Sequence, residues 1–170
     1  MEGSIITVIA WDGTTLAVDS RITTESHIVC DSAIKLWDLR TTKKKVVALI
    51  DGGDKIQAVA LAGASTLFTS YLTALQSNTL HEFALRIAEE DEEDLYLSGI
   101  IIGYKAVYHI EGLSPHFSAY PLHEPAHAGS GGIIAKSAMM LGLNAIEAVA
   151  HTIKIDHHCG GEVKSLRLYS

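Results

Sequence analysis

Three side chains near the start of the chain have complementary chemistry: the Thr7 hydroxyl, the Asp19 carboxylate and the Lys35 amine, the last of them sixteen residues after Asp19. A hydroxyl becomes a nucleophile when a neighbouring base removes its proton, and a nearby cation lowers the pKa values of the hydroxyl and of that base. A carboxylate beside the lysine would hold the lysine in place. These residue types therefore predict attack of an activated hydroxyl on a carbonyl, provided that the fold brings them together.

The residues around these side chains predict a β-hairpin and a third strand. Two short β-prone runs, 5–11 and 14–20, flank Asp12-Gly13, a dipeptide that tolerates the positive φ angles of a tight hairpin turn. A third β-prone run, 27–37, includes Lys35. A hydroxyl near the start of the hairpin, a carboxylate on its return strand and a lysine on the next strand can meet at one end of a sheet.

Two glycine-containing segments in the second half of the chain add polar groups. The segment 129–132, Gly-Ser-Gly-Gly, precedes a predicted helix, and backbone N–H groups near such a turn are candidates for an oxyanion hole. The segment 156–161, Asp-His-His-Cys-Gly-Gly, follows another predicted helix and forms a predicted turn. Both segments belong to the candidate site because of the resemblance that follows.

Together, these segments resemble the N-terminal-nucleophile (Ntn) hydrolases of the proteasome β-subunit and HslV type, including compact phage-encoded members. That family opens with a threonine, a hairpin and an Asp-x-Arg sequence or a variant of it, followed by a lysine sixteen residues after the aspartate. Asp19, Arg21 and Lys35 fit this spacing, and the segments 129–132 and 156–161 extend the resemblance over nearly the whole chain.

The resemblance implies a role for each matching residue. The first residue of the mature chain is the family's nucleophile and its own α-amine is the base, a group that titrates at about 7.7–8.0. Thr7 aligns with that residue. The other implied catalytic residues are Asp19, Lys35, Ser130 and Asp156, with Arg21, Gly129, Gly131 and Cys159 in support. Cys159 stands where the family has a serine, and a thiol is a weaker hydrogen-bonding group.

The residues before Thr7 leave three possibilities open. While Ile6-Thr7 is an intact amide, Thr7 has no free amine, so activity requires removal of residues 1–6 as a leader. Cleavage after Gly3 would instead expose Ser4, an alternative nucleophile fifteen residues before Asp19. We favour Thr7, because the sequence that follows it matches the opening of the compact relatives. Without any cleavage, the chain would be a catalytically silent member of the family.

The remaining sequence alternates predicted strands and helices. Residues 95–104 include three consecutive isoleucines and predict a central strand buried on both faces. Asn144 with Glu147 forms a capping-box signature for a helix, and residues 121–128 are predicted to be a loop. Further strands are predicted over 46–50, 56–62, 105–111, 116–120 and 162–169, and further helices after residues 63–65, after Thr79 and from 129–132 through Leu141.

This order of elements predicts the fold class. Each pair of helices has one apolar face, and the simplest way to bury both faces stacks two sheets and covers each with a helix pair. The prediction is an α+β fold, a four-layer α/β/β/α sandwich, in one domain over residues 1–170 with 1–6 as the possible leader. The Ntn hydrolases have this same architecture, so the pattern and the resemblance agree.

The composition excludes several other classes of protein. The chain is 48% hydrophobic and 19% charged, which is typical of a globular protein and not of a disordered one. A formal net charge of −7 argues against nucleic acid as the main partner. No apolar run approaches the roughly 18 residues of a membrane span, and two cysteines are too few for a disulfide framework. We therefore expect a cytoplasmic protein with no membrane partner.

Other interpretations of the histidines and glycines are weaker. A zinc site could be imagined from His123, His127, His157, His158 and Cys159, but Pro125 disfavours the helix that a His-Glu-x-x-His motif needs. The segment 129–132 lacks the lysine of a nucleotide-binding P-loop. We therefore expect no metal and no other cofactor.

Two functional hypotheses remain. The first is a threonine-type peptidase of the proteasome and HslV kind that hydrolyses peptide or protein substrates. The second is a catalytically silent protein of the same fold that acts as an assembly or binding subunit. The resemblance implies a homo-oligomeric ring and an ATP-dependent unfoldase as a possible partner.

Overall fold

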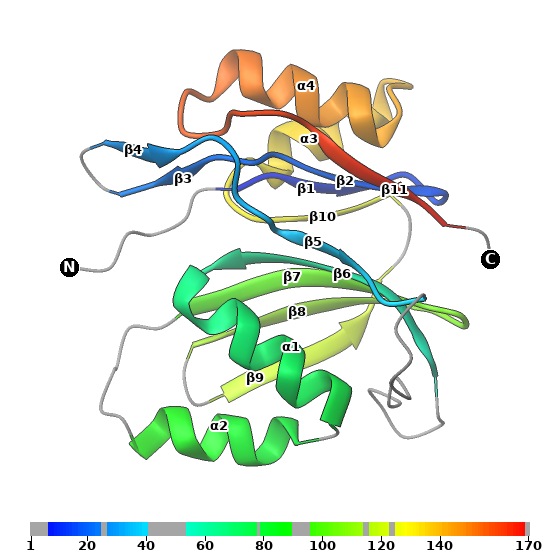
Figure 1. The fold of residues 1–170 in the computed structure, drawn as a ribbon. Helices are drawn as coiled ribbons and strands as arrows, with labels where there is room; N and C mark the ends of the chain where they lie inside the picture. The colour runs from blue at the N-terminus through cyan, green and yellow to red at the C-terminus, as the bar shows by residue number, and fades with distance from the viewer. Residues whose placement is uncertain are drawn as a thin grey trace.

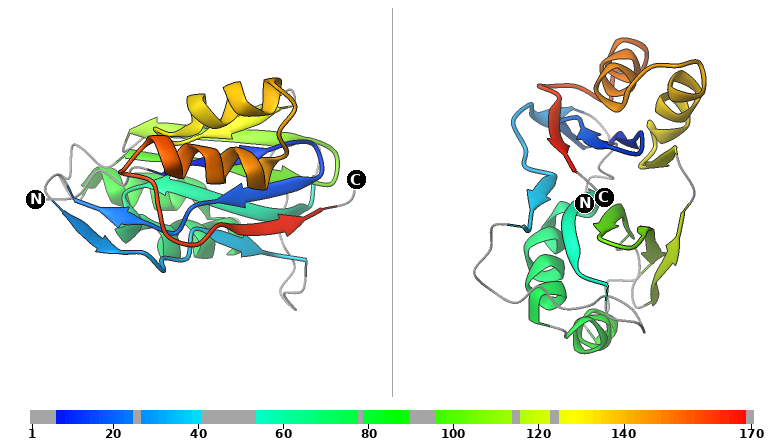
Figure 2. Two further views of the ribbon diagram at one scale, coloured as in Figure 1. Left: turned by 90° about the horizontal axis from the view of Figure 1, so that it is seen from above. Right: turned by 90° about the vertical axis from the view of Figure 1, so that its right-hand side faces the viewer.

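Two stacked β-sheets form the centre of the molecule, and a pair of helices covers the outer face of each sheet (Figure 1). The computed structural model describes residues 7–24, 27–40, 54–77, 79–89, 96–113, 116–122 and 125–168. The end-on view shows the helix pairs on opposite sides of the two sheets (Figure 2). The predicted four-layer α/β/β/α sandwich is therefore confirmed.

The first sheet contains the predicted hairpin and has the strand order β10-β1-β2-β11. Its strands are β1 (Ile9–Trp11), β2 (Thr15–Val18), β10 (Ala126–Ala128) and β11 (Lys164–Arg167), and all neighbours are antiparallel. The turn between β1 and β2 forms as predicted. Gly13 has a φ of 102°, and Asp12 Oδ1 accepts hydrogen bonds from the backbone N–H groups of Thr14 and Thr15.

The second sheet has the strand order β5-β6-β7-β8-β9. Strand β7 (Tyr96–Gly103) lies at its centre and is buried along almost its whole length, as its isoleucines predict. Its neighbours are β6 (Ile56–Gly63) and β8 (Val107–Leu113), with β5 (Leu36–Asp38) and β9 (His116–Pro121) at the edges. A cluster of buried residues that includes Ile9, Leu16 and Ile100 fills the space between the two sheets.

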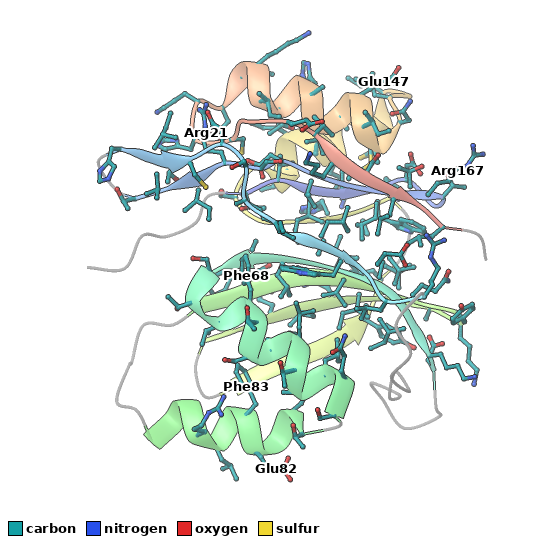
Figure 3. All side chains as sticks on the ribbon, in the orientation of Figure 1. Arg21, Phe68, Glu82, Phe83, Glu147 and Arg167 are labelled. Atoms are coloured by element: carbon teal, nitrogen blue, oxygen red, sulfur yellow. The ribbon has the colours of Figure 1, made fainter. Side chains whose placement is uncertain are left out.

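The helices cover the sheets through apolar faces. Helices α3 (Gly132–Met140) and α4 (Ala145–Ile155) pack on the first sheet, and the predicted capping box between Asn144 and Glu147 begins α4. A short 3₁₀ turn (Ser65–Leu67) leads into α1 (Phe68–Ser77), and α2 (Leu80–Glu89) follows. Phe68 of α1 faces the second sheet and makes an edge contact with Trp37, while Phe83 of α2 contacts Tyr71 of α1 (Figure 3).

Two sequence predictions about strands were wrong. The predicted single strand 27–37 is two strands, β4 (Ile28–Cys30), which pairs with β3 (Ile22–Thr23), and β5 in the second sheet. The chain crosses from one sheet to the other between these two strands. The N–H of Ala33 still donates to the carbonyl oxygen of Ser20, whereas the carbonyl oxygen of Lys35 accepts from the N–H of Leu61 in the second sheet. The predicted loop 121–128 contains strand β10. This strand has only three residues, which are too few to show a periodic pattern in the sequence. The predicted strand 46–50 lies outside the described residues.

None of the helices in the described part of the chain has the length and apolar character needed to cross a membrane.

A buried carboxylate holds the turn between β7 and β8. Asp54 is 4% exposed and accepts hydrogen bonds from the backbone N–H groups of Lys105 and Ala106 and from the Tyr108 hydroxyl, which lies 2.9 Å from its Oδ2. Since a buried donor without an acceptor loses its hydrogen bonds to water and gains nothing in return, this carboxylate should contribute strongly to stability.

We expect Asp54→Ala to lower the free energy of unfolding by about 3 kcal/mol, because it leaves several donors unsatisfied. Urea denaturation monitored by circular dichroism measures the change. Glu162→Ala is the control, since that side chain is 75% exposed, and it should change stability by less than about 0.5 kcal/mol. Equal effects of the two substitutions would contradict a structural role for Asp54.

Candidate active site

The hairpin places Thr7 beside Asp19 at one end of the first sheet. Ile9 pairs with Val18, so the next pair along the strands is Val8 with Asp19. The backbone N–H of Val8 donates to Asp19 Oδ1 at 3.3 Å, and the N–H of Gly160 donates to Asp19 Oδ2 at 3.0 Å. The Asp19 carboxylate is thus fixed by backbone groups from two distant parts of the chain.

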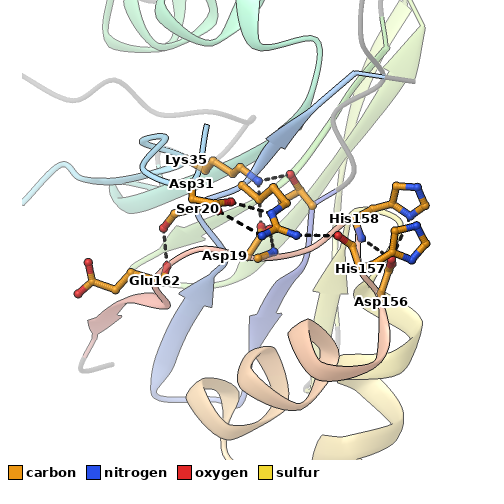
Figure 4. A network of polar contacts seen from close by, with 11 residues as sticks. Asp19, Ser20, Asp31, Lys35, Asp156, His157, His158 and Glu162 are labelled. Atoms are coloured by element: carbon orange, nitrogen blue, oxygen red, sulfur yellow. Dashed lines mark hydrogen bonds and ion pairs between the residues drawn. The ribbon is translucent and has the colours of Figure 1, made fainter. Parts of the chain in front are cut away.

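Lys35 reaches this carboxylate from the segment that crosses between the sheets. Its Nζ lies 2.7 Å from Thr7 Oγ1 and 2.9 Å from Asp19 Oδ1. Thr7 and Asp19 are 0% exposed and Lys35 is 1% exposed. Figure 4 shows the Lys35 side chain directed at Asp19. The structure therefore assembles the three residues that the sequence singled out first.

The electrostatics of this group depend on burial. Burial lowers the pKa of the Lys35 ammonium, and the Asp19 carboxylate opposes that shift. A lysine that is protonated beside a hydroxyl stabilises the deprotonated form of that hydroxyl, and the paired carboxylate compensates the charge. The arrangement can therefore favour an alkoxide at Thr7 without requiring Lys35 to act as the base.

The glycine turn 129–132 lies against the backbone of Thr7. Strand β10 pairs with β1 so that Ile9 is opposite Ala128, and extending this register sets Thr7 opposite Ser130. Gly129 has a φ of 79°, and a Cβ there would lie 2.2 Å from the Thr7 carbonyl oxygen. The N–H of Gly131 donates to that same oxygen at 3.1 Å. Gly131 is therefore engaged with Thr7 itself, and Ser130 is exposed.

Asp156 and Cys159 lie behind this turn. Asp156 Oδ1 accepts from the backbone N–H of His158 at 3.0 Å, and the Cys159 thiol is 3.8 Å from Asp156 Oδ2. Cys159 is buried, and a Cβ on Gly131 would lie 2.9 Å from its sulfur. Burial raises the pKa of the Cys159 thiol, so it is a neutral packing group at pH 7. The hydrogen bonds of Asp156 join residues of its own loop and the end of α4, without direct contact to Thr7 or Lys35 among the described residues.

Arg21 ties this loop to the crossing segment. Its Nε is 2.7 Å from Asp31 Oδ1, and its NH1 group donates to the His157 carbonyl oxygen at 2.7 Å. The guanidinium lowers the pKa of the Asp31 carboxyl. A Cβ on Gly160 would lie 2.3 Å from the Arg21 guanidinium carbon, so a larger residue there would displace the Arg21 side chain from its present position. Arg21 thus positions the residue whose N–H binds Asp19.

A cavity of about 550 Å³ lies beside the glycine turn, and sequence reasoning missed it. Gly129 and Ser130 form part of its wall, and its polar lining also includes Tyr96, His109, Glu111, His127 and Lys136. These residues come from β7, β8, β10 and α3, which meet only in the folded chain. No spacing in the sequence could have brought them together.

The imagined zinc set is not assembled. Among the described residues, the only side chains grouped closely enough to hold a metal are Asp156, His157 and His158, and neither His127 nor Cys159 belongs to this group. Within this group, a 3.2 Å hydrogen bond joins His158 Nδ1 and Asp156 Oδ1. His123, like Ser4 and the rest of residues 1–6, lies outside the described residues.

Two solved structures illustrate the proteins whose fold is similar to that of this chain. HslV from Trypanosoma brucei matches with a TM-score of 0.60 and 20% sequence identity, over 95% of this chain and 99% of that chain. A structure described as Thiobacillus denitrificans BPH matches with a TM-score of 0.59 and 17% identity, over 95% of this chain and 96% of that chain. No protein-family model and no curated protein matches the sequence. At these identities the likeness shows the fold.

The buried pair gives a stability prediction. Asp19→Leu leaves the Lys35 ammonium buried without a counter-charge, and Lys35→Met leaves the Asp19 carboxylate unpaired. Each substitution should therefore lower the free energy of unfolding by about 3–5 kcal/mol. The double variant leaves neither charge unpaired. Its loss in free energy of unfolding should therefore be at least about 2 kcal/mol smaller than the sum of the losses in the two single variants. Urea denaturation of the four proteins measures this coupling.

The exposed pair of Lys164 and Glu162 is the control for that cycle. Its side chains are 49% and 75% exposed, and its coupling should stay below about 1 kcal/mol. Additive effects at Asp19 and Lys35 would show that the two charges do not depend on each other.

Proposed function

We propose that the chain is a proteasome-like threonine peptidase in which Thr7, once it is the first residue, attacks the carbonyl of a peptide bond. The observation that carries the proposal is the contact of the buried Lys35 ammonium with both the Thr7 hydroxyl, at 2.7 Å, and the Asp19 carboxylate, at 2.9 Å. The HslV-like fold supports it. A buried cation beside a hydroxyl lowers the pKa of that hydroxyl, which helps a base to remove its proton.

The reaction can be written with the groups of this site. The free α-amine of Thr7 accepts the hydroxyl proton as Oγ1 attacks the substrate carbonyl, and that proton passes to the leaving amine as the peptide bond breaks. The resulting ester on Thr7 is hydrolysed by water, which restores the hydroxyl. Lys35 keeps its proton throughout and lowers the pKa of the hydroxyl and of the amine, while Asp19 holds Lys35 in place. By the resemblance, Ser130 would orient the amine, while Asp156, whose hydrogen bonds stay within its own loop and the end of α4, would act through that loop.

This chemistry requires a free amine at Thr7. In the sequence Ile6 precedes Thr7, so the Ile6-Thr7 bond must be broken before the base exists. Cleavage before Ser4 would place a different hydroxyl first, farther along the chain from the Lys35 ammonium. The contact of Lys35 with the Thr7 hydroxyl supports Thr7 over Ser4.

A homo-oligomeric ring and an ATP-dependent unfoldase are further parts of the proposal. The only support for them is the HslV-like fold, since HslV is the protein named for a matching structure. Sedimentation velocity of the purified chain would decide the state of assembly.

A silent subunit is the second candidate function, and one observation favours it. Thr7 is 0% exposed in the structure, so its hydroxyl is not open to a substrate there. In a chain that is never cleaved, the buried contact between Lys35 and the Thr7 hydroxyl would stabilise the fold, and the protein would act by binding a partner.

Two matched deletion variants test the nucleophile. Deleting residues 2–6 places Thr7 directly after the initiator methionine, which methionine aminopeptidase removes before a small residue, and deleting residues 2–3 does the same for Ser4. We expect hydrolysis of a fluorogenic peptide by the first protein, and a loss of at least about a thousandfold on Thr7→Ala. Intact mass must first show that each methionine is gone.

Activity of the variant that begins at Ser4, with none from the one that begins at Thr7, would move the nucleophile to Ser4. No activity from either, with both N-termini free, would replace the peptidase by the silent subunit.

The pH dependence of hydrolysis follows from the identity of the base. An α-amine is a base only when neutral, so the rate should rise with pH and reach a plateau. Because the Lys35 cation lowers the pKa of the amine, the apparent pKa of kcat/KM should lie below about 7.7. A pH profile from about 5 to about 9 on the chain that begins at Thr7 measures it. A rate that falls over this range would exclude the amine as the base.

A further inference from the structure

The cavity beside the glycine turn has a cationic side, which we call the His127–Lys136 side after the two residues that form it. Both residues line the cavity, as do Gly129 and Ser130, and Gly129 contacts the Thr7 backbone. The wall of the cavity therefore adjoins the Thr7 backbone, and a peptide that reaches Thr7 from this side would pass along it. The size of about 550 Å³ is in the range of small-ligand sites, which is roughly 300–1,000 Å³.

His127 lines this cavity, and its two ring nitrogens differ in their surroundings. Its Nδ1 is buried without a hydrogen-bond partner among the described residues, and a Cβ on Gly132 would lie 2.6 Å from it. Burial and the Lys136 cation lower the pKa of His127, so the ring is neutral at pH 7. A buried N–H without an acceptor is less favourable than a bare lone pair, so we assign the proton to Nε2. His127 then offers a donor to a ligand.

Lys136 supplies the charge. It lies on α3 one turn after the start of the helix, its side chain is exposed, and it belongs to none of the ion pairs among the described residues. Lys136 and His127 line the same cavity, and the Lys136 charge lowers the pKa of His127. A cation of this kind beside a neutral N–H donor is a site for a carboxylate.

Glu111, the one acid among the described residues of the cavity wall, is already engaged. It accepts a hydrogen bond from the Tyr96 hydroxyl at 3.1 Å, and its Oε2 lies 3.8 Å from Nδ1 of His109. Its carboxylate therefore already has partners on β7 and β8.

We propose that this side of the cavity binds an acidic side chain of the peptide substrate, so that the site prefers peptides with Asp or Glu close to the scissile bond. The inference rests on the proposed function. Helix α3 begins at Gly132, directly after the turn that contacts Thr7, and Lys136 lies about 6 Å farther along the helix axis. An extended peptide advances about 3.3 Å per residue. The acidic residue should therefore lie within about three residues of the bond that is cut.

Binding tests the proposal without requiring catalysis. The probes are two blocked hexapeptides that differ only in Asp against Asn at one position, each titrated into the 170-residue chain and into the chain that begins at Thr7 with Thr7→Ala. The Asp peptide should bind about tenfold more tightly to at least one of these proteins, since a charge-assisted hydrogen bond replaces a neutral one. Higher salt should reduce the difference.

Charge variants assign the preference to its residues. Lys136→Met should abolish the Asp preference, and Lys136→Arg should retain it. Glu111→Gln should increase it, because it removes a negative charge and keeps the hydrogen-bonding shape. Lys154→Met is the matched control, since Lys154 is exposed on α4 and does not line the cavity. It changes the net charge by the same amount and should leave the preference unchanged.

Hydrolysis by the chain that begins at Thr7 gives a second readout. The ratio of kcat/KM for the Asp and Asn peptides should match the binding ratio and fall to about one in Lys136→Met, while cleavage of the Asn peptide continues. Absence of hydrolysis with a Lys136-dependent binding preference would refute the peptidase and keep the acidic site. The proposed acidic-residue site would be overturned if the Asp and Asn peptides bound equally or not at all. It would also be overturned if Lys154→Met reduced the Asp preference as much as Lys136→Met does.

Discussion

The rest of the site depends on one buried ion pair. Lys35 and Asp19 are charged groups with fully buried side chains, and such a pair is stable only if the remaining hydrogen-bonding positions are filled. The fold fills them with the Thr7 hydroxyl and with the backbone N–H groups of Val8 and Gly160. Each of these groups is therefore held in place by the need to compensate a buried charge. The hydroxyl that could do chemistry is part of this compensation.

The two-sheet architecture is what makes the pair possible. Asp19 directly follows β2 of the first sheet, while Lys35 directly precedes β5 of the second. The segment that crosses between the sheets brings the Lys35 ammonium to Asp19. Gly160, in the loop that follows α4, then closes the site, and Arg21 holds that loop through the His157 carbonyl oxygen. A single sheet would place both charges on one surface, where water would screen them and weaken their effect on a neighbouring hydroxyl.

Much of this arrangement could be predicted from the sequence. The fixed spacing from Asp19 to Lys35, the Asp12-Gly13 turn and the apolar strand 95–104 are local patterns, and each appears in the structure. The change of sheet after Cys30 and the strand Ala126–Ala128 were missed, because they depend on backbone pairing with distant residues. The cavity was missed for the same reason. The engagement of the Gly131 N–H with Thr7 also could not be read from a Gly-Ser-Gly sequence.

The central claim is that Thr7, as a free N-terminal residue, is an activated nucleophile. The most direct test is reaction of the chain that begins at Thr7 with a peptide epoxyketone, a probe that needs an amine and a hydroxyl on the same residue to close its ring. We expect one adduct by intact mass, located on Thr7 by peptide sequencing, and none when the Ile6-Thr7 bond is intact. A chain with a verified free Thr7 that forms no adduct, or forms it elsewhere, would contradict the claim.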